Sequence, residues 1–75
     1  MFINIELKTS GNIWKILVEK NQVVSEGDIL FIMEVMKMEI PHTAPCDGLI
    51  SVINITEGDE GLDAGIVAIS ITPTN

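Results

Sequence analysis

The chain of 75 residues is long enough for one small domain, and it carries a formal net charge of −7. Proteins that bind nucleic acids or anionic membranes need the opposite sign, so the composition argues against both classes. The single cysteine, Cys46, excludes an internal disulfide, and no cluster of Cys and His residues predicts a metal site. The fold must therefore be stabilised by apolar packing, for which the chain supplies 13 Ile and 6 Val residues.

No targeting segment and no membrane-spanning segment is predicted. The first residues lack a basic flank followed by an apolar run, and no stretch approaches about 18 consecutive apolar residues. A free thiol in a chain without an export signal is typical of the reducing cytoplasm. We therefore expect a cytoplasmic protein with no membrane insertion of its own.

The apolar residues follow the two-residue period of β-strands, and no segment has a helical period. Ile3, Ile5 and Leu7 alternate with polar residues, which indicates a half-buried first strand. Glycine, asparagine and aspartate in the intervening segments are typical of turns. Further strands are predicted over about 12–18, 22–24, 29–34, 38–42, 49–55, 60–63 and 66–71.

The two halves of the chain repeat one pattern with an offset of 37 residues. Gly11 aligns with Gly48, and Asn21, which tolerates positive φ, aligns with Gly58. Neither half is long enough to bury an apolar face alone. We expect an all-β domain, either a flattened β-barrel or a sandwich of two small antiparallel sheets with pseudo-twofold symmetry. Eight isoleucines should then share one core: Ile13, Ile16, Ile29, Ile32, Ile50, Ile53, Ile66 and Ile69.

A single lysine interrupts the apolar segment between the two halves. Lys37 stands between Met36 and Met38, after the apolar run Ile29–Met33 and before Pro41. An unpaired ammonium group is costly to bury, and β-branched residues and Pro41 disfavour a helix. The sequence therefore predicts a two-residue hairpin centred on Met36 and Lys37. Such turns prefer Asn-Gly or similar pairs, so Met-Lys indicates a use other than stability.

Three residues carry further expectations. Lys37 should be fully exposed near the pseudo-twofold axis, with both termini at the opposite end of the domain. Trp14 is expected in the core or as a half-buried cover of a sheet, and His42 as a surface residue of a strand. The alternative interpretation of Lys37 is an edge-strand lysine that only prevents aggregation.

The segment Glu34–Met38 resembles the attachment motif of biotinyl domains, the biotin carboxyl carrier modules of biotin-dependent carboxylases and decarboxylases. The resemblance covers roughly residues 5–71 and includes Gly11 and the segments Gly27–Leu30, Ala44–Gly48 and Glu57–Asp59. It implies that residues 1–75 are a single biotinyl domain with the hammerhead fold of biotinyl and lipoyl domains. It also implies a non-catalytic carrier.

By position, the resemblance implies that Lys37 carries biotin through an amide bond, attached by a biotin protein ligase. Met36 and Met38 would be flanking recognition residues, with Val35 and Glu34 completing the motif. These methionines distinguish the family from lipoyl domains, which usually carry acidic and small residues beside their lysine. The carrier would then move CO2, as carboxybiotin on Lys37, from a biotin carboxylase site to a carboxyltransferase site of a partner subunit or domain.

Two departures from the family pattern stand out. Many members have Ala or Ser in place of Val35, and the extra loop of some bacterial acetyl-CoA carboxylase carriers is missing between Val18 and Gly27. The missing loop argues against the standard bacterial acetyl-CoA carboxylase carrier. The alternative function is a lipoyl carrier of a 2-oxo acid dehydrogenase or glycine cleavage system. A third interpretation is an unmodified β-module for protein interaction.

Overall fold

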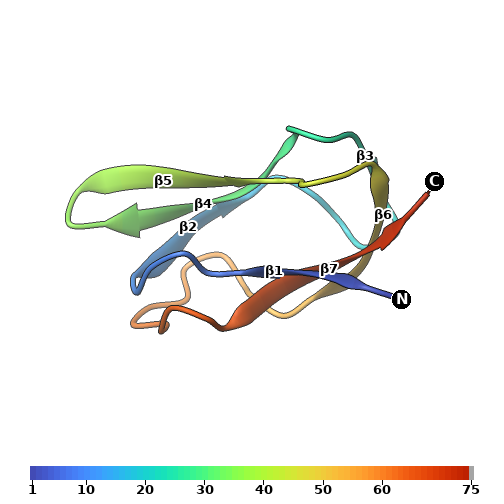
Figure 1. Ribbon diagram of the computed structural model, residues 1–75. Helices are drawn as coiled ribbons and strands as arrows, with labels where there is room; N and C mark the ends of the chain where they lie inside the picture. Colours follow the sequence, from blue (N-terminus) through green and yellow to red (C-terminus); the bar gives the residue numbers. More distant parts are fainter. Residues whose placement is uncertain (75) are drawn as a thin grey trace.

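The computed structural model, which describes residues 1–74, contains two small antiparallel β-sheets whose inner faces meet (Figure 1). The expected all-β class is thereby confirmed. One sheet has the strand order β1-β7-β6-β3, and the other has the order β2-β4-β5. The strands are β1 Ile3–Glu6, β2 Asn12–Ile16, β3 Val23–Val24, β4 Ile29–Val35, β5 Met38–Thr43, β6 Gly48–Ile53 and β7 Val67–Pro73.

No part of residues 1–74 forms a helix that is long and apolar enough to cross a membrane.

The predicted strands agree with the structure except in the region 60–63. That region contains only an isolated bridge between Gly11 and Leu62. Gly61 has a φ of +67°, so the chain leaves the extended conformation there, and its N–H group donates to Oδ1 of Asn12. The predicted strands over 12–18 and 49–55 end two residues early, at Ile16 and Ile53.

Backbone hydrogen bonds show that the two halves exchange equivalent contacts. The N–H group of Asn21 donates to the carbonyl of Ile50 at 2.7 Å, and that of Gly58 donates to the carbonyl of Ile13 at 2.9 Å. Adding 37 to the residue number of the donor Asn21 gives Gly58, and subtracting 37 from that of the acceptor Ile50 gives Ile13. Asn21 and Gly58 also share a left-handed backbone, with φ of 73° and 90°. Pseudo-twofold symmetry therefore relates these segments as predicted.

The offset between the halves grows to 38 residues after the acidic turns. The N–H group of Gly27 donates to the carbonyl of Ala44, and that of Gly65 donates to the carbonyl of Leu7. These acceptors are 37 residues apart, whereas the donors are 38 apart. Strand β4 therefore corresponds to β7 with the longer offset. We call two residues related in this way mates: the offset is 37 for residues up to Gln22 and 38 for Gly27–Val35.

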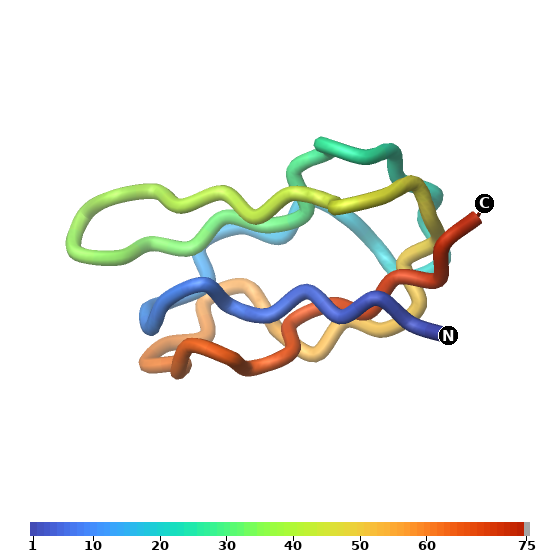
Figure 2. The backbone as a smooth tube through the Cα atoms, viewed as in Figure 1, coloured from blue at the N-terminus to red at the C-terminus, as the bar shows by residue number. Residues whose placement is uncertain are grey.

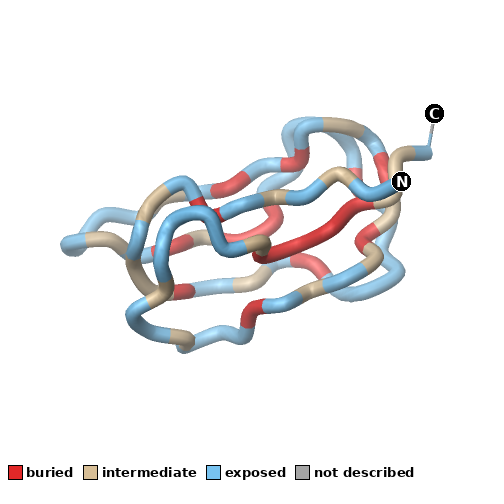
Figure 3. The backbone as a smooth tube through the Cα atoms, turned by 60° about the horizontal axis from the view of Figure 1, so that its bottom comes forward, coloured by how far each residue is buried: buried red, intermediate tan, exposed pale blue. Residues whose placement is uncertain are grey.

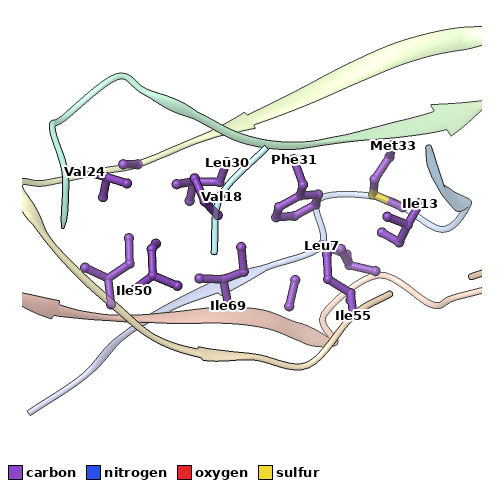
Figure 4. Close-up of a cluster of buried hydrophobic side chains, with 13 residues drawn as sticks. Leu7, Ile13, Val18, Val24, Leu30, Phe31, Met33, Ile50, Ile55 and Ile69 are labelled. Carbon is purple, nitrogen blue, oxygen red and sulfur yellow. The ribbon is translucent and has the colours of Figure 1, made fainter. Parts of the chain in front are cut away.

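The longer offset corrects the predicted core. Phe31, rather than Ile32, is the mate of Ile69, and a shift of one residue moves a side chain to the other face of a strand. Ile29 and Ile66 are accordingly 43% and 38% exposed. Of the eight isoleucines, Ile13, Ile50 and Ile69 are buried, while Ile16, Ile53 and Ile32 are half-buried. The largest fully buried side chains include Phe31, Ile13, Leu30, Met33, Ile50, Ile69 and Ile71. Figure 3 colours the buried positions of the backbone red, and Figure 4 shows Phe31, Leu30, Met33 and Ile69 among the side chains between the sheets.

The β4-β5 hairpin extends from one end of the domain, and both termini lie at the other end (Figure 2). The domain measures 37 × 18 × 17 Å. The symmetry explains this arrangement, because the mates of β4 and β5 are β7 and β1, the strands next to the termini. The expected position of the termini is confirmed. The expectation that Lys37 lies near the pseudo-twofold axis is wrong. The pseudo-twofold rotation superposes the hairpin end of the domain on the end that carries the termini, so Lys37 lies far from the axis.

His42 is buried, with 1% of its surface exposed, so its expected place on the surface is wrong. Its ring stacks on Phe31 with centroids 4.4 Å apart. Nε2 accepts the backbone N–H of Lys8 at 3.1 Å, and Nδ1 lies 3.4 Å from the carbonyl oxygen of Ile40. These contacts fit a neutral ring with its proton on Nδ1, which donates to Ile40.

The mate half shows why a histidine occupies this buried position. The mates of His42 and Lys8 are Ile5 and Pro45. Proline has no N–H group, so the position equivalent to Lys8 needs no acceptor and an isoleucine suffices beside it. Lys8 does have an N–H group, and a buried donor without a partner is costly. The imidazole therefore supplies both apolar packing and one acceptor.

His42 should make the free energy of unfolding decrease as the pH is lowered below about 6.5. Burial lowers the pKa of His42, and the charge of Lys8 lowers it further, while the hydrogen bond to Ile40 opposes the shift. The unfolded state therefore binds the proton first. The stabilisation is complete above the unfolded pKa and is lost as pH falls toward the lower folded pKa.

Urea denaturation between pH 7.5 and 5.5 tests this prediction, since His42 is the chain's only histidine. His42→Gln, whose amide oxygen can accept the N–H of Lys8 without titrating, should remove the His42 contribution to the pH slope. His42→Ile should also remove it but should cost about 1–3 kcal/mol of stability, because the Lys8 donor loses its partner. An unchanged slope in His42→Gln would contradict the prediction.

Candidate functional site

Met36 and Lys37 form the two-residue turn between β4 and β5, as predicted. The flanking residues Val35 and Met38 pair across the hairpin. Met36 has a φ of 49° and Lys37 a φ of 69°, so both lie in the left-handed region of a type I′ turn. This conformation costs a residue with a Cβ about 1–2 kcal/mol, so the tip adopts it at the expense of stability.

The side chains at the tip are displayed to solvent. Lys37 is exposed, and Met36 and Met38 are 91% and 63% exposed. Met33, on the same hairpin, is fully buried in the core. The two flanking methionines therefore do not fill the core. Their exposure leaves three flexible side chains available to another molecule, and their role in recognition stays a prediction.

The base of the hairpin is fixed by close packing with the segment before β2. Val35 is half-buried and packs against the core. A Cβ at Gly11 would lie only 2.7 Å from Cγ2 of Val35 and 3.0 Å from the carbonyl oxygen of Glu34. Only glycine allows this approach without displacement of the hairpin. Gly11 therefore belongs to the machinery that positions the tip, a role that sequence reasoning missed although the repeat with Gly48 marked the residue.

Two carboxylates lie directly behind the tip. Glu34 of β4 pairs with Glu39 of β5, and both side chains are exposed. Like charges directly opposite each other destabilise a hairpin. Glu34 thus lies where the motif predicted it, together with Val35, Met36, Lys37 and Met38. The structure adds Glu39, which the sequence analysis did not assign to the site.

The arrangement is that of a displayed primary amine rather than of a catalytic cleft. Residues 1–74 enclose no pocket, and they hold no group of three or more His, Cys, Asp and Glu side chains placed to bind a metal ion. An amine at the end of a four-carbon stem on a hairpin tip is accessible from most directions. It fits covalent attachment of a group by another enzyme, which requires access to the amine and no binding cavity.

Comparison with known proteins agrees with this geometry. Residues 4–71 match the family model described as biotin-requiring enzyme. The chain is 33% identical over 57 residues to a biotin/lipoyl attachment protein of Bacillus subtilis, with 76% of this chain and 78% of that protein covered. It is 29% identical over 56 residues to a protein of Mycobacterium leprae that is named as the homolog of a biotinylated protein, with 75% of this chain and 79% of that protein covered.

Solved structures show the same fold in larger enzymes and in a separate domain. A urea carboxylase of Kluyveromyces lactis matches with a TM-score of 0.87 and 26% identity, covering 96% of this chain and 6% of the enzyme. The lipoyl domain of a 2-oxoglutarate dehydrogenase complex from Azotobacter vinelandii matches with a TM-score of 0.74 and 19% identity, covering 92% of this chain and 98% of that domain.

The match of the family model to residues 4–71, together with the Bacillus subtilis relative, shows that this chain belongs to the biotin/lipoyl attachment family, small carrier domains in which biotin or a lipoyl group is typically attached to a lysine.

Proposed function

We propose that the chain is a biotin carrier that moves CO2 between a biotin carboxylase site and a carboxyltransferase site of a biotin-dependent carboxylase or decarboxylase. The observation that carries the proposal is the exposed Met36-Lys37-Met38 sequence at the turn of a protruding hairpin. The resemblance associates methionines on both sides of the lysine with biotin. Relatives named as biotinylated or biotin-dependent support the same choice.

For attachment, Nζ of Lys37 would attack the acyl carbon of biotinyl-adenylate in a biotin protein ligase. An amide bond forms, AMP leaves, and the proton passes to a base of the ligase. Attached biotin supplies the chemistry of carboxyl transfer. The chain itself supplies display and reach, and so it works by raising the local concentration of the reacting group.

The position of the termini suits this role. They lie at the end of the domain opposite the hairpin, along its 37 Å axis (Figure 1). A partner or linker that holds the terminal end would leave the tip free to move between two sites. The proposal places the carrier in the cytoplasm, where the free thiol of Cys46 would stay reduced.

A lipoyl carrier of a 2-oxo acid dehydrogenase or glycine cleavage system is the second candidate. It is supported by the likeness to a lipoyl domain, which shares the fold. Such a carrier would use the same lysine and hairpin, so the methionines are the feature that favours biotin. The mass of the chain purified from its own host separates the candidates, because biotin and lipoate add different masses to Lys37.

Lys37→Arg should abolish biotin attachment and leave stability nearly unchanged. Arginine keeps the positive charge at an exposed position but offers no primary amine to acylate. Streptavidin binding and intact mass after expression with a biotin protein ligase measure attachment, and thermal unfolding measures stability. Lys8→Arg is the matched control and should be biotinylated normally. Attachment to the Lys37→Arg chain would refute the site.

Met36→Asn and Met38→Thr should slow biotin attachment without destabilising the domain. Asparagine tolerates the left-handed backbone of position 36, and threonine suits an exposed strand position. Met33→Ala is the contrasting control, and it should cost about 2–5 kcal/mol because that methionine is buried. The initial rate of attachment and urea denaturation are the two measurements. A loss of that size in either tip variant would show that its methionine supports the fold.

A further inference from the structure

The outer face of the β2-β4-β5 sheet carries apolar side chains. The register places Ile32 of β4 between Lys15 of β2 and Pro41 of β5. Trp14 lies beside Lys15 at an irregularity where two residues of β2 oppose one of β4. Nζ of Lys15 lies over the Trp14 ring, 5.6 Å from its centroid. Leu17, which follows β2, and Ile29, the first residue of β4, are also exposed. We call the set the outer strip: Trp14, Leu17, Ile29, Ile32 and Pro41.

Exposure within the outer strip is substantial. Trp14 is 43% exposed, Leu17 is 49% exposed and Ile29 is 43% exposed. Ile32 is half-buried and is not among the residues that pack against the core. Apolar side chains gathered on one face in this way are typical of interaction sites.

The positions of the other sheet that are equivalent to the outer strip are mostly polar, although Val52 is exposed on the same outer face. Four of the five mates of the outer strip carry hydroxyl or amide groups, and the mate of Ile29 is Val67. The four polar mates of Trp14, Leu17, Ile32 and Pro41 are, in that order, Ser51, Asn54, Ser70 and Asn4.

The polar mates form hydrogen bonds within their own sheet. The hydroxyl of Ser70 lies 2.9 Å from Oδ1 of Asn4, to which it donates, and Nδ2 of Asn54 donates to the carbonyl of Val67 at 3.1 Å. The same backbone thus tolerates a polar outer face. The fold therefore does not require apolar residues at these positions, and this motivates the search for a use of the outer strip outside the fold.

Charges around the outer strip define what could cover it. Glu34 and Glu39 lie opposite each other between the strip and the tip, and Asp28 lies next to Ile29 at the other end. Repulsion between the paired carboxylates would be relieved by a basic group placed against them. The cation that the register places beside the outer strip is Lys15 of β2, which pairs with Ile32. The facing surface should therefore be apolar at its centre and basic where it meets Glu34 and Glu39.

We propose that the outer strip is a docking surface for such a protein partner, and that, given the proposed function, the partner is the biotin carboxylase subunit that acts on the biotin carried by Lys37. A rise of about 3.3 Å per residue places Ile32 about 13 Å behind the turn residue Met36. A ligase must draw the amine itself into its active site, so it contacts the tip. A subunit that acts at the far end of the lysine and its biotin need not enclose the turn, so it can dock behind the tip.

The test compares the biotinylated chain with the double variant Trp14→Ser with Ile32→Ser. In this variant each residue is replaced by the serine that its mate carries. The probe is the biotin carboxylase subunit of the same host, with ATP and bicarbonate, and ADP release is followed against carrier concentration. The variant should raise KM for the carrier about tenfold and leave kcat at saturation unchanged. Val52→Ser, on the outer face of the opposite sheet, is the matched control and should leave KM unchanged.

Other results would overturn the docking surface. Equal KM values for the variant and the wild-type chain would refute the docking surface. A biotin protein ligase that attaches biotin to the variant more slowly would assign the strip to the ligase instead. A wild-type dimer in sedimentation that the variant abolishes would assign it to a second copy of this chain. Thermal unfolding confirms that the variant is folded before each comparison.

The proposed function fails in a distinguishable way. A biotinylated wild-type chain that the carboxylase does not use, although the subunit turns over free biotin, would refute the carrier proposal and this inference with it. Use of the wild-type chain with unaltered kinetics for the variant would refute the docking surface alone.

Discussion

The structure depends on the contact between the inner faces of its two sheets. Neither half of the chain has enough apolar surface to fold alone, so Ile13 and Met33 of one half pack in a common core with Ile50 and Ile71 of the other. Backbone hydrogen bonds that cross between the halves hold the same contact at its rim. The core is complete without the turn of the β4-β5 hairpin. The tip can therefore contain a strained pair of residues and an exposed amine without loss of the fold.

The amino-acid pattern predicts the features that depend on short-range chemistry. Alternation of apolar residues gives the all-β class, and the charge of Lys37 between two strands gives the centre of the hairpin. The exchange of Asn21 for Gly58 follows from the backbone that both positions require. The class and the hairpin centre use a few neighbouring residues each, and the equivalence of Asn21 and Gly58 uses only the repeat of the pattern along the chain. Pairing between distant strands is not needed for any of these predictions.

Features that depend on register could not be predicted in this way. One additional residue lies between Asp59 and Gly65, compared with Gln22 and Gly27, and it changes the offset from 37 to 38. A shift of one residue reverses the face of a strand, so the constant offset of 37 predicts Ile29 inside although it lies outside. His42 was misplaced for a related reason. Its partner, the N–H of Lys8, is 34 residues away in the sequence.

Differences between mates separate what the fold needs from what other molecules need. His42 and Lys8 stand where the other half has Ile5 and Pro45. The N–H group of Lys8 has its acceptor within the chain, because it donates to Nε2 of His42. The left-handed Met36-Lys37 turn and the outer strip have no such compensation. One strains the backbone and the other leaves apolar surface in water. Nothing within the described residues offsets these two costs, whereas the partners proposed above would offset them on binding. Both belong to the β2-β4-β5 sheet, with the turn at one end of the sheet and the outer strip on its outer face.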